Sequence, residues 1–321
     1  NITNWGNRAA SIRWYHVFRN TLFSNFTLAY SKYNYLMYNF FKRTDPGLNS
    51  YSAQEEYNFS SYVRDLIVKT DLDIPIKRNN LKAGIKYTYH LFDPGTISYS
   101  QIMQINNRDS VMNPPEAKLR LNAAETSVYV EFHWKVGDNL SGNFGFRTSN
   151  YSVEERTYRS FQPRLIIIFE LVEDLSINSA YSEMQQNLHL LTNSNIGLPS
   201  DLWIPSTQNI QPEKSRQFGL GLVKILNGKY EISIEAYCKS LENLIDYKEG
   251  VLVYNSSLNW NEKIESDGIG HMRGIEFLAN KKYGKFTGWI GYTYSKNIRT
   301  FKSLNNGETF PFKYDQPHEI N

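Results

Sequence analysis

The chain has very little cysteine and no long apolar run. Cys238 is the single cysteine among 321 residues, which excludes an internal disulfide framework and any metal site built from several cysteines. The longest apolar run, residues 165–172, is interrupted by Glu170. A membrane-spanning helix needs about 20 apolar residues. Any part of this chain that crosses a membrane must therefore cross it as strands.

The chain also lacks an excess of charge and a recognisable leader. Its 35 basic residues nearly balance 32 acidic ones, the formal net charge is +3, and the basic residues are scattered. No field of one sign is expected to attract nucleic acid, so we expect no nucleic-acid partner. The sequence begins with Asn1 and shows no signal-peptide pattern, so we expect it to be mature, trimmed or partial.

Patterns that carry catalysis or metal binding are missing as well. The six histidines form neither an HExxH motif nor a His-x-His pair, and no glycine-rich phosphate loop precedes a helix. Glu131 and His133 share one face of an expected strand, and a polar lining explains them better than an acid–base pair. The same interpretation applies to the alternating charges Asp65, Lys69, Asp71 and Asp73. We expect no catalytic residues, no metal site and no cofactor.

Aromatic residues, by contrast, are abundant in an otherwise polar chain. They make up 15% of the residues, including 23 tyrosines, while hydrophobic residues reach only 40% and the mean hydropathy is −0.52. A packed soluble core would need more apolar residues. This composition fits a structure with a wet interior.

Alternation with a period of two residues is the dominant pattern, and it indicates strands with two different faces. Residues 81–91, 128–136 and 230–239 alternate apolar and polar side chains at every position. Short turns are expected at Asn20-Thr21, Asn79-Asn80, Gly137-Asp138, Glu173-Asp174, Asn227-Gly228 and Gly284-Lys285. Longer polar connections are expected at 36–56, 92–116, 150–157, 187–212, 247–267 and 300–317, so that short and long connections strictly alternate.

About twelve strands joined in this way predict an all-β, antiparallel, up-and-down sheet. Outer-membrane barrels combine short periplasmic turns with longer extracellular loops, and we expect a transmembrane β-barrel of this kind. A soluble β-sandwich or propeller is the alternative. It gives no reason for tyrosines near strand ends, whereas an aromatic girdle at the bilayer boundary does. The expected girdle residues are Tyr30, Tyr33, Tyr35, Tyr87, Tyr89, Tyr292 and Tyr294.

The barrel is expected to be incomplete in residues 1–321. The first strand, about 8–19, starts on the long-loop side, and the twelfth, about 286–299, ends there before residues 318–321 begin another strand. Unpaired edge strands in lipid would cost several kcal/mol per polar group. We therefore expect further strands before and after this chain.

Several stretches resemble the C-terminal half of the barrel of TonB-dependent receptors, of the kind abundant in Bacteroidota. These stretches are FQPRL at 161–165, YSEMQQNLHLL at 181–191, LPSDLWIPS at 198–206, IQPE at 210–213 and YDQPH at 314–318. The resemblance is specific over most of residues 155–321 and architectural elsewhere. It implies a barrel of roughly 22 strands, and an N-terminal plug domain and closing strands that this chain lacks.

The resemblance implies active uptake of a solute across the outer membrane, with no enzymatic activity. The implied partners are the TonB-ExbB-ExbD complex, reached through the plug, the outer-membrane lipids, and a surface lipoprotein as a further candidate. An outer-membrane enzyme of the phospholipase or protease type and a passive channel are the alternatives.

The segment 184–215 is expected to be an extracellular connection that contacts the solute. It has three prolines and almost no charge before Glu213. Loops carry function on rigid scaffolds, so His189, Asn193, Asp201 and Trp203 are our candidate ligand-binding residues. The alternative is that Trp203 packs inside its own loop and the prolines only stiffen it.

Overall fold

The computed structural model describes residues 2–19, 21–45, 51–105, 108–112, 120–191, 202–251 and 260–321. Within these residues a single sheet of 15 strands dominates the molecule, and a separate two-stranded sheet accompanies it. No helix in the described ranges is long and apolar enough to cross a membrane.

The long strands follow one another as antiparallel neighbours in the order of the chain. They are β1 (Ile2–Arg19), β2 (Leu22–Asp45), β3 (Tyr51–Ile76), β4 (Asn79–Ile105), β6 (Leu121–Val136), β7 (Leu140–Val153), β8 (Arg156–Val172), β9 (Leu175–Gln186), β12 (Glu213–Leu226), β13 (Tyr230–Tyr247), β14 (Ile264–Lys281) and β15 (Gly288–Thr300). This confirms the twelve-strand, up-and-down arrangement.

Short elements complete the structure. β5 (Arg108–Met112) pairs with β4, while β16 (Phe310–Pro311) and β17 (His318–Ile320) pair with β15. β10 (Leu188–Leu191) and β11 (Leu202–Pro205) form the second sheet, and the 3₁₀ helices η1 (Trp260–Lys263) and η2 (Asn305–Gly307) lie in connections. Within the described residues no pairing joins the β1 edge to the β15 edge.

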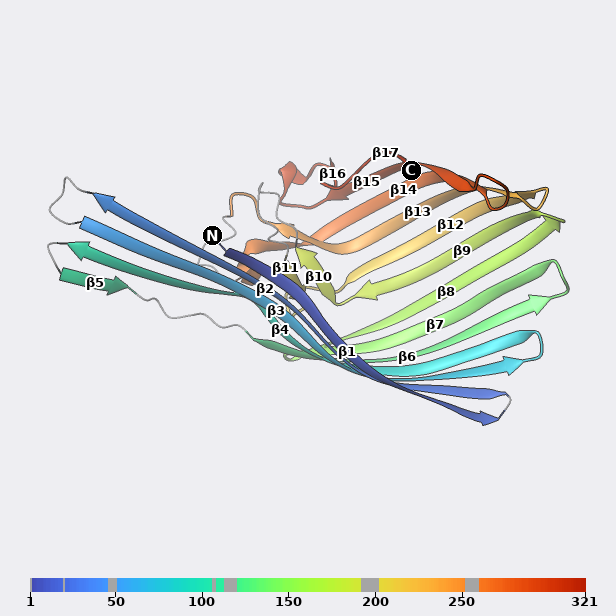
Figure 1. Ribbon diagram of the computed structural model, residues 1–321, viewed down its shortest axis with the longest axis horizontal. Coiled ribbons are helices and arrows are strands. Elements are labelled where there is room, and N and C mark those ends of the chain that lie inside the picture. The colour runs from blue at the N-terminus through green and yellow to red at the C-terminus, as the bar shows by residue number, and fades with distance from the viewer. Residues whose placement is uncertain are drawn as a thin grey trace.

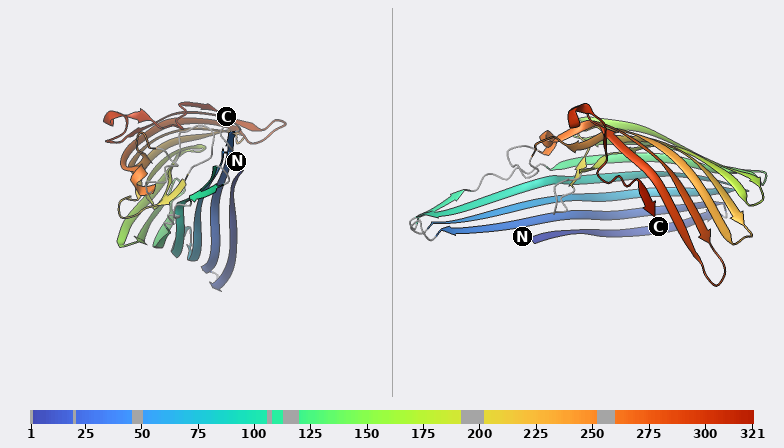
Figure 2. Two further views of the ribbon diagram at one scale, coloured as in Figure 1. Left: turned by 90° about the vertical axis from the view of Figure 1, so that its left-hand side faces the viewer. Right: turned by 90° about the horizontal axis from the view of Figure 1, so that it is seen from above.

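The large sheet is curved like a trough (Figure 2). Its two faces differ in chemistry. Paired residues of antiparallel strands share a face, so the register extends each face across the sheet. The convex face carries apolar side chains that are about half exposed: Ile85 (50%), Phe144 (50%), Leu220 (49%), Ile234 (48%) and Ile275 (53%). Apolar surface of this extent needs a non-aqueous cover.

Most expected tight turns are present, with one shift. The turns at 137–139, 173–174 and 227–229 agree with the prediction, and residues 282–287 join β14 to β15. The turn expected at Asn79-Asn80 lies instead at Lys77-Arg78, because both asparagines already pair within β4. Asn20 lies outside the described residues.

The expected long connections are shorter than predicted. β2, β3 and β4 continue to Asp45, from Tyr51 and to Ile105, so 36–56 and 92–116 are mostly strand. The connection between β7 and β8 is the two-residue turn Glu154-Glu155, so short and long connections do not strictly alternate. β2 to β5 project as a blade beyond the other strands (Figure 1). The sequences of the projecting ends lack a regular alternation of apolar and polar side chains, so the period-two pattern does not detect them.

Five of the seven tyrosines expected in the aromatic girdle are exposed, and the other two are not. Tyr30, Tyr87, Tyr89, Tyr292 and Tyr294 are 40–45% exposed, as a girdle requires. Tyr33 and Tyr35 belong instead to an apolar cluster with Phe59. Tyr30 and Tyr33 are an odd number of positions apart, so alternation places them on opposite faces of β2.

Candidate functional site

The hairpin formed by β10 and β11 lies inside the trough, against its concave face (Figure 2). Leu188 pairs with Pro205 and Leu191 with Leu202, which makes a short antiparallel ladder. The hairpin contacts β3 and β4 on one side and β13 on the other. The segment that follows β9 therefore bridges two walls of the trough.

Two apolar clusters hold the hairpin to these walls. In the first, the fully buried Ile204 joins side chains of β2 and β3 to side chains of β13 and β14; its buried members are Tyr35, Met37, Phe59, Leu191, Leu202, Ile204, Ile210, Ile245 and Ile264. In the second, Leu188 and Trp203 pack against Val63, Phe92, Leu121, Ala123, Tyr151 and Val153. Fully burying one such side chain contributes about 1.5–3 kcal/mol, so the hairpin is firmly seated.

His189 is the polar centre of the hairpin and is completely buried. Its Nε2 shares a hydrogen bond of 2.9 Å with Ser206 Oγ. Its Nδ1 lies 3.3 Å from Glu213 Oε1, which is within ion-pair distance but not aligned for a hydrogen bond. These contacts connect β10 to the residue after β11 and to the first residue of β12.

Ser206, His189 and Glu213 lie in the order of a serine-hydrolase triad. Ser206 is also completely buried, however, so no substrate can reach its hydroxyl. A catalytic nucleophile must contact the atom that it attacks. The arrangement is a structural contact that fixes the hairpin.

Residues 206–212 run across the trough as a strap that the strands hold by hydrogen bonds. Tyr158 donates its hydroxyl to the carbonyl oxygen of Thr207 at 2.5 Å, and Tyr151 donates to the carbonyl oxygen of Ser206 at 3.5 Å. On the opposite wall, Asn243 donates to the carbonyl oxygen of Pro212 at 2.9 Å. The hydroxyl of Ser266 also donates to the carbonyl oxygen of Asn209, at 3.4 Å. Side chains of β7, β8, β13 and β14 thus bind backbone carbonyl groups of the strap.

The candidate ligand-binding residues have different environments. Asn193 and Asp201 lie outside the described residues. Trp203 is partly buried and packs against the second cluster together with Tyr158 and Trp260. His189 is turned inward, as described above. Contact of these four residues with a solute stays a prediction.

A cavity of about 400 Å³ opens beside the hairpin on the concave face. Its lining combines Leu188 with charged and polar side chains of the walls, among them Lys86, His90, Glu125, Arg147, Asn187 and Glu213. Glu125 is held by Arg147 at 3.3 Å and by the amide of Asn187 at 3.1 Å. The cavity therefore has fixed polar groups around an open space.

The charged residues expected on one face of the third long strand do line the concave face. Lys69 pairs with Asp71 at 2.9 Å, and the Tyr129 hydroxyl donates to the same carboxylate. Asp65 pairs with His90 at 2.8 Å. Glu131 lies 3.2 Å from His133, as a polar wall lining does.

Lys263, at the end of η1, is buried beside the hairpin clusters. Its backbone carbonyl accepts a hydrogen bond of 2.9 Å from the backbone amide of Lys248, the residue after β13. Burial lowers the pKa of the Lys263 ammonium below its usual value. The neutral form is therefore easier to reach than in a solvated lysine.

Sequence reasoning missed Ser206 and Glu213. Ser206 follows His189 by 17 residues, and only the pairing of β10 with β11 brings them together. The spacing of residues along one strand or one helix could not have predicted this contact.

Comparison with protein families identifies the chain. Residues 1–320 match the family model described as TonB dependent receptor-like, beta-barrel. The chain belongs to this family. The match places it among outer-membrane barrels of a non-enzymatic family. Short turns of such barrels are periplasmic, so the hairpin lies at the extracellular mouth.

Solved structures of TonB-dependent receptors share the fold. The pyoverdine outer membrane receptor FpvA from Pseudomonas aeruginosa PAO1 has a TM-score of 0.64 and 12% identity, with 99% of this chain and 47% of FpvA covered. The ferric-catecholate import receptor Fiu from E. coli K12 has a TM-score of 0.59 and 12% identity, with coverages of 99% and 51%.

The RagAB peptide transporter is also similar, with a TM-score of 0.58, 12% identity and coverages of 95% and 38%. The chain thus spans about half, or less, of the length of these proteins. No curated protein matches it.

Proposed function

We propose that this chain is part of a TonB-dependent receptor that binds a solute and imports it actively across the outer membrane. The observation that carries the proposal is the family match over residues 1–320. The hairpin held at the extracellular mouth supports it, because it offers a rigid base for the loops that meet the solute. The coverage of 47% and 51% of two receptors supports the expectation that a plug and further strands lie outside residues 1–321.

Energy would come from the TonB-ExbB-ExbD complex acting on that plug. The barrel wall would then be a scaffold, and its paired charges, such as Lys69 and Asp71, would line the water-filled interior and face the plug. Charged linings of this kind are normal for barrel interiors.

We further propose the Bacteroidota type of receptor, with a surface lipoprotein as partner. Similarity to the RagAB peptide transporter supports this finer assignment, together with the stretches at 181–191 and 198–206. The blade of β2 to β5 projects beyond the other strands (Figure 1). Since short turns of such barrels are periplasmic, the blade would project on the extracellular side and offer a surface for such a partner.

For the solute, we propose contacts from Asn193, Asp201 and Trp203, carried by the seated hairpin. His189 would contact the solute only if the hairpin opens, because its ring is buried in this structure. Alanine substitution of Asp201 and Trp203 should weaken uptake and affinity together. Unchanged uptake and affinity would overturn this assignment.

Uptake by intact cells tests the receptor function. The full-length gene is deleted and restored in its own host, and accumulation of labelled peptides, glycans and iron chelates is measured with and without ExbB. We expect accumulation that needs both the gene and ExbB. Accumulation without ExbB, together with steady conductance in planar bilayers, would instead show a passive channel. Hydrolysis of lipid or peptide by the purified protein would show an enzyme.

A further inference from the structure

A second candidate site lies on the convex, membrane-facing side of β9, β12, β13, β14 and β15. The register defines horizontal rows of side chains across these strands. Close to the middle of the strands the central positions of the rows are apolar, as at Leu220, Ala236 and Ile275, whose row ends at Ser179 on β9 and at the girdle residue Tyr294 on β15. Apolar rows of this kind face the hydrocarbon of the bilayer.

The next two rows toward the extracellular end change in character. The first consists of Tyr181, Phe218, Cys238, Arg273 and Lys296, and the second of Glu183, Arg216, Ser240, His271 and Ile298. Tyrosines mark the bilayer boundary in outer-membrane barrels. The cations Arg216, Arg273 and Lys296 therefore lie at the level of the lipid headgroups, with apolar side chains directly below them.

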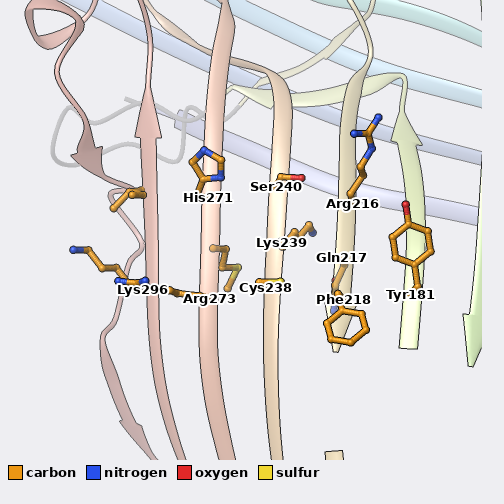
Figure 3. A pocket seen from close by; sticks show the side chains of 12 residues that line it. Tyr181, Arg216, Gln217, Phe218, Cys238, Lys239, Ser240, His271, Arg273 and Lys296 are labelled. Atoms are coloured by element: carbon orange, nitrogen blue, oxygen red, sulfur yellow. The ribbon is translucent and has the colours of Figure 1, made fainter. Parts of the chain in front are cut away.

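These rows line a shallow groove with a volume of about 490 Å³. Figure 3 shows Arg216 and His271 at its extracellular end and Phe218, Cys238 and Arg273 below them. The groove thus carries cations in both of its rows, beside Phe218, and the apolar side chains Leu220, Ala236 and Ile275 lie in the row directly below it. A lipid has the same arrangement of headgroup above acyl chain.

The cations outnumber the carboxylates in this groove. Arg216 lies 3.5 Å from Glu183, and Glu183 also accepts a hydrogen bond of 2.6 Å from the hydroxyl of Tyr181. Arg273 and Lys296 form no ion pair within the part of the chain that the structure describes. Cations next to hydrocarbon gain from an anionic partner, and arginine binds phosphate in a bidentate manner.

We propose that this groove binds a phosphorylated glycolipid of the outer leaflet, with its phosphates on Arg273, Lys296 and Arg216 and an acyl chain along Phe218. The cations extend from β12 to β15, which is about 14 Å at a strand spacing of about 4.8 Å. That span suits a headgroup with two phosphates better than a phospholipid with one. The site is independent of the solute and of the receptor function.

Native mass spectrometry of the full-length receptor tests the proposal, with lipid A carrying two phosphates as the probe. The double variant Arg273→Gln and Lys296→Gln should retain lipid A at least about tenfold more weakly. The matched control is the double variant Lys224→Gln and Lys281→Gln, on the convex face of β12 and β14 at the periplasmic end; it should bind like the wild type. The variant Arg273→Lys and Lys296→Arg keeps both charges and should restore binding.

Three outcomes would overturn the proposal. If the Arg273→Gln and Lys296→Gln double variant retains lipid A as strongly as the wild type, the two cations only extend into water and bind no phosphate. Equal retention of dephosphorylated lipid A would mean that the groove binds acyl chains alone. Equal retention of phosphatidylglycerol would contradict the choice of a glycolipid. Heat-dependent gel mobility of each variant verifies that its barrel is folded.

Discussion

His189 Nε2 lies 2.9 Å from Ser206 Oγ, and both side chains are completely buried between the hairpin and the walls of the barrel. This contact joins the start of the hairpin to the strap that follows it. Residues 188–191 and 202–212 thus form a fixed structure at the mouth of the barrel.

Replacement of His189 by alanine should loosen the hairpin. It leaves the Ser206 hydroxyl without its partner and creates a cavity, which together should destabilise the hairpin by about 2–4 kcal/mol. Hydrogen exchange of residues 188–191 and 202–206 should become faster while that of β6 and β7 stays unchanged. His16→Ala, at an exposed position on β1, is the control. Unchanged exchange in the His189 variant would show that the contact is dispensable.

Tyr158→Phe should release the strap locally. The variant keeps the ring in the apolar cluster but removes the hydrogen bond to the Thr207 carbonyl, at a cost of about 1 kcal/mol. Faster exchange of the amide of Ile210, which bonds to Thr207 Oγ1, would report this release. Tyr15→Phe, on the exposed face of β1, should have no such effect. The idea fails if both variants exchange alike.

Gly142→Ala should disturb the periplasmic half of the wall. A Cβ at Gly142 would lie 2.5 Å from the Trp134 ring and 2.5 Å from the Ile166 carbonyl oxygen, so the indole must move. We expect a loss of about 1–3 kcal/mol in unfolding free energy, measured by tryptophan fluorescence in urea. Gly219→Ala is the matched control, because its Cβ would meet nothing closer than 3.9 Å. Equal stability of the two variants would contradict the close packing of Trp134 on Gly142.

Lys263 should give the extracellular end a pH dependence. Its folded-state pKa lies below its usual value, so the unfolded chain binds more protons in the window between the lowered pKa and 10.5. Stability should therefore rise as the pH rises through that window. Lys263→Met removes the titrating group, and the slope of the unfolding midpoint against pH should decrease. An identical slope would contradict the role of Lys263.

The strands could be predicted from the sequence because their chemistry alternates in the bilayer. Residues 81–91 and 128–136 pair as expected within β4 and β6. The ends of β2 and β3 could not be predicted in this way, because residues 39–45 and 51–57 show no regular alternation of apolar and polar side chains. Their true pairing, such as Arg43 with Ala53, depends on the neighbouring strand.

The candidate site was only partly accessible to the same reasoning. The segment 184–215 stands out in the sequence, but the inward position of Leu188 and Trp203 depends on walls formed by residues far away in the chain, such as Phe92 and Tyr151. The groove lined by Arg216, Arg273 and Lys296 could have been found from the sequence. Arg273 lies on the apolar face of its strand, two positions from Ile275, which is an unusual place for a charge.

Solute uptake by cells that carry a receptor without the hairpin tests the central claim most directly. Residues 188–205 are replaced by a short glycine-serine linker in the full-length gene, and ExbB-dependent uptake is compared with that of the wild type at equal amounts of folded protein in the outer membrane. The account predicts that the barrel still inserts and that uptake is lost. Full uptake without the hairpin would contradict it.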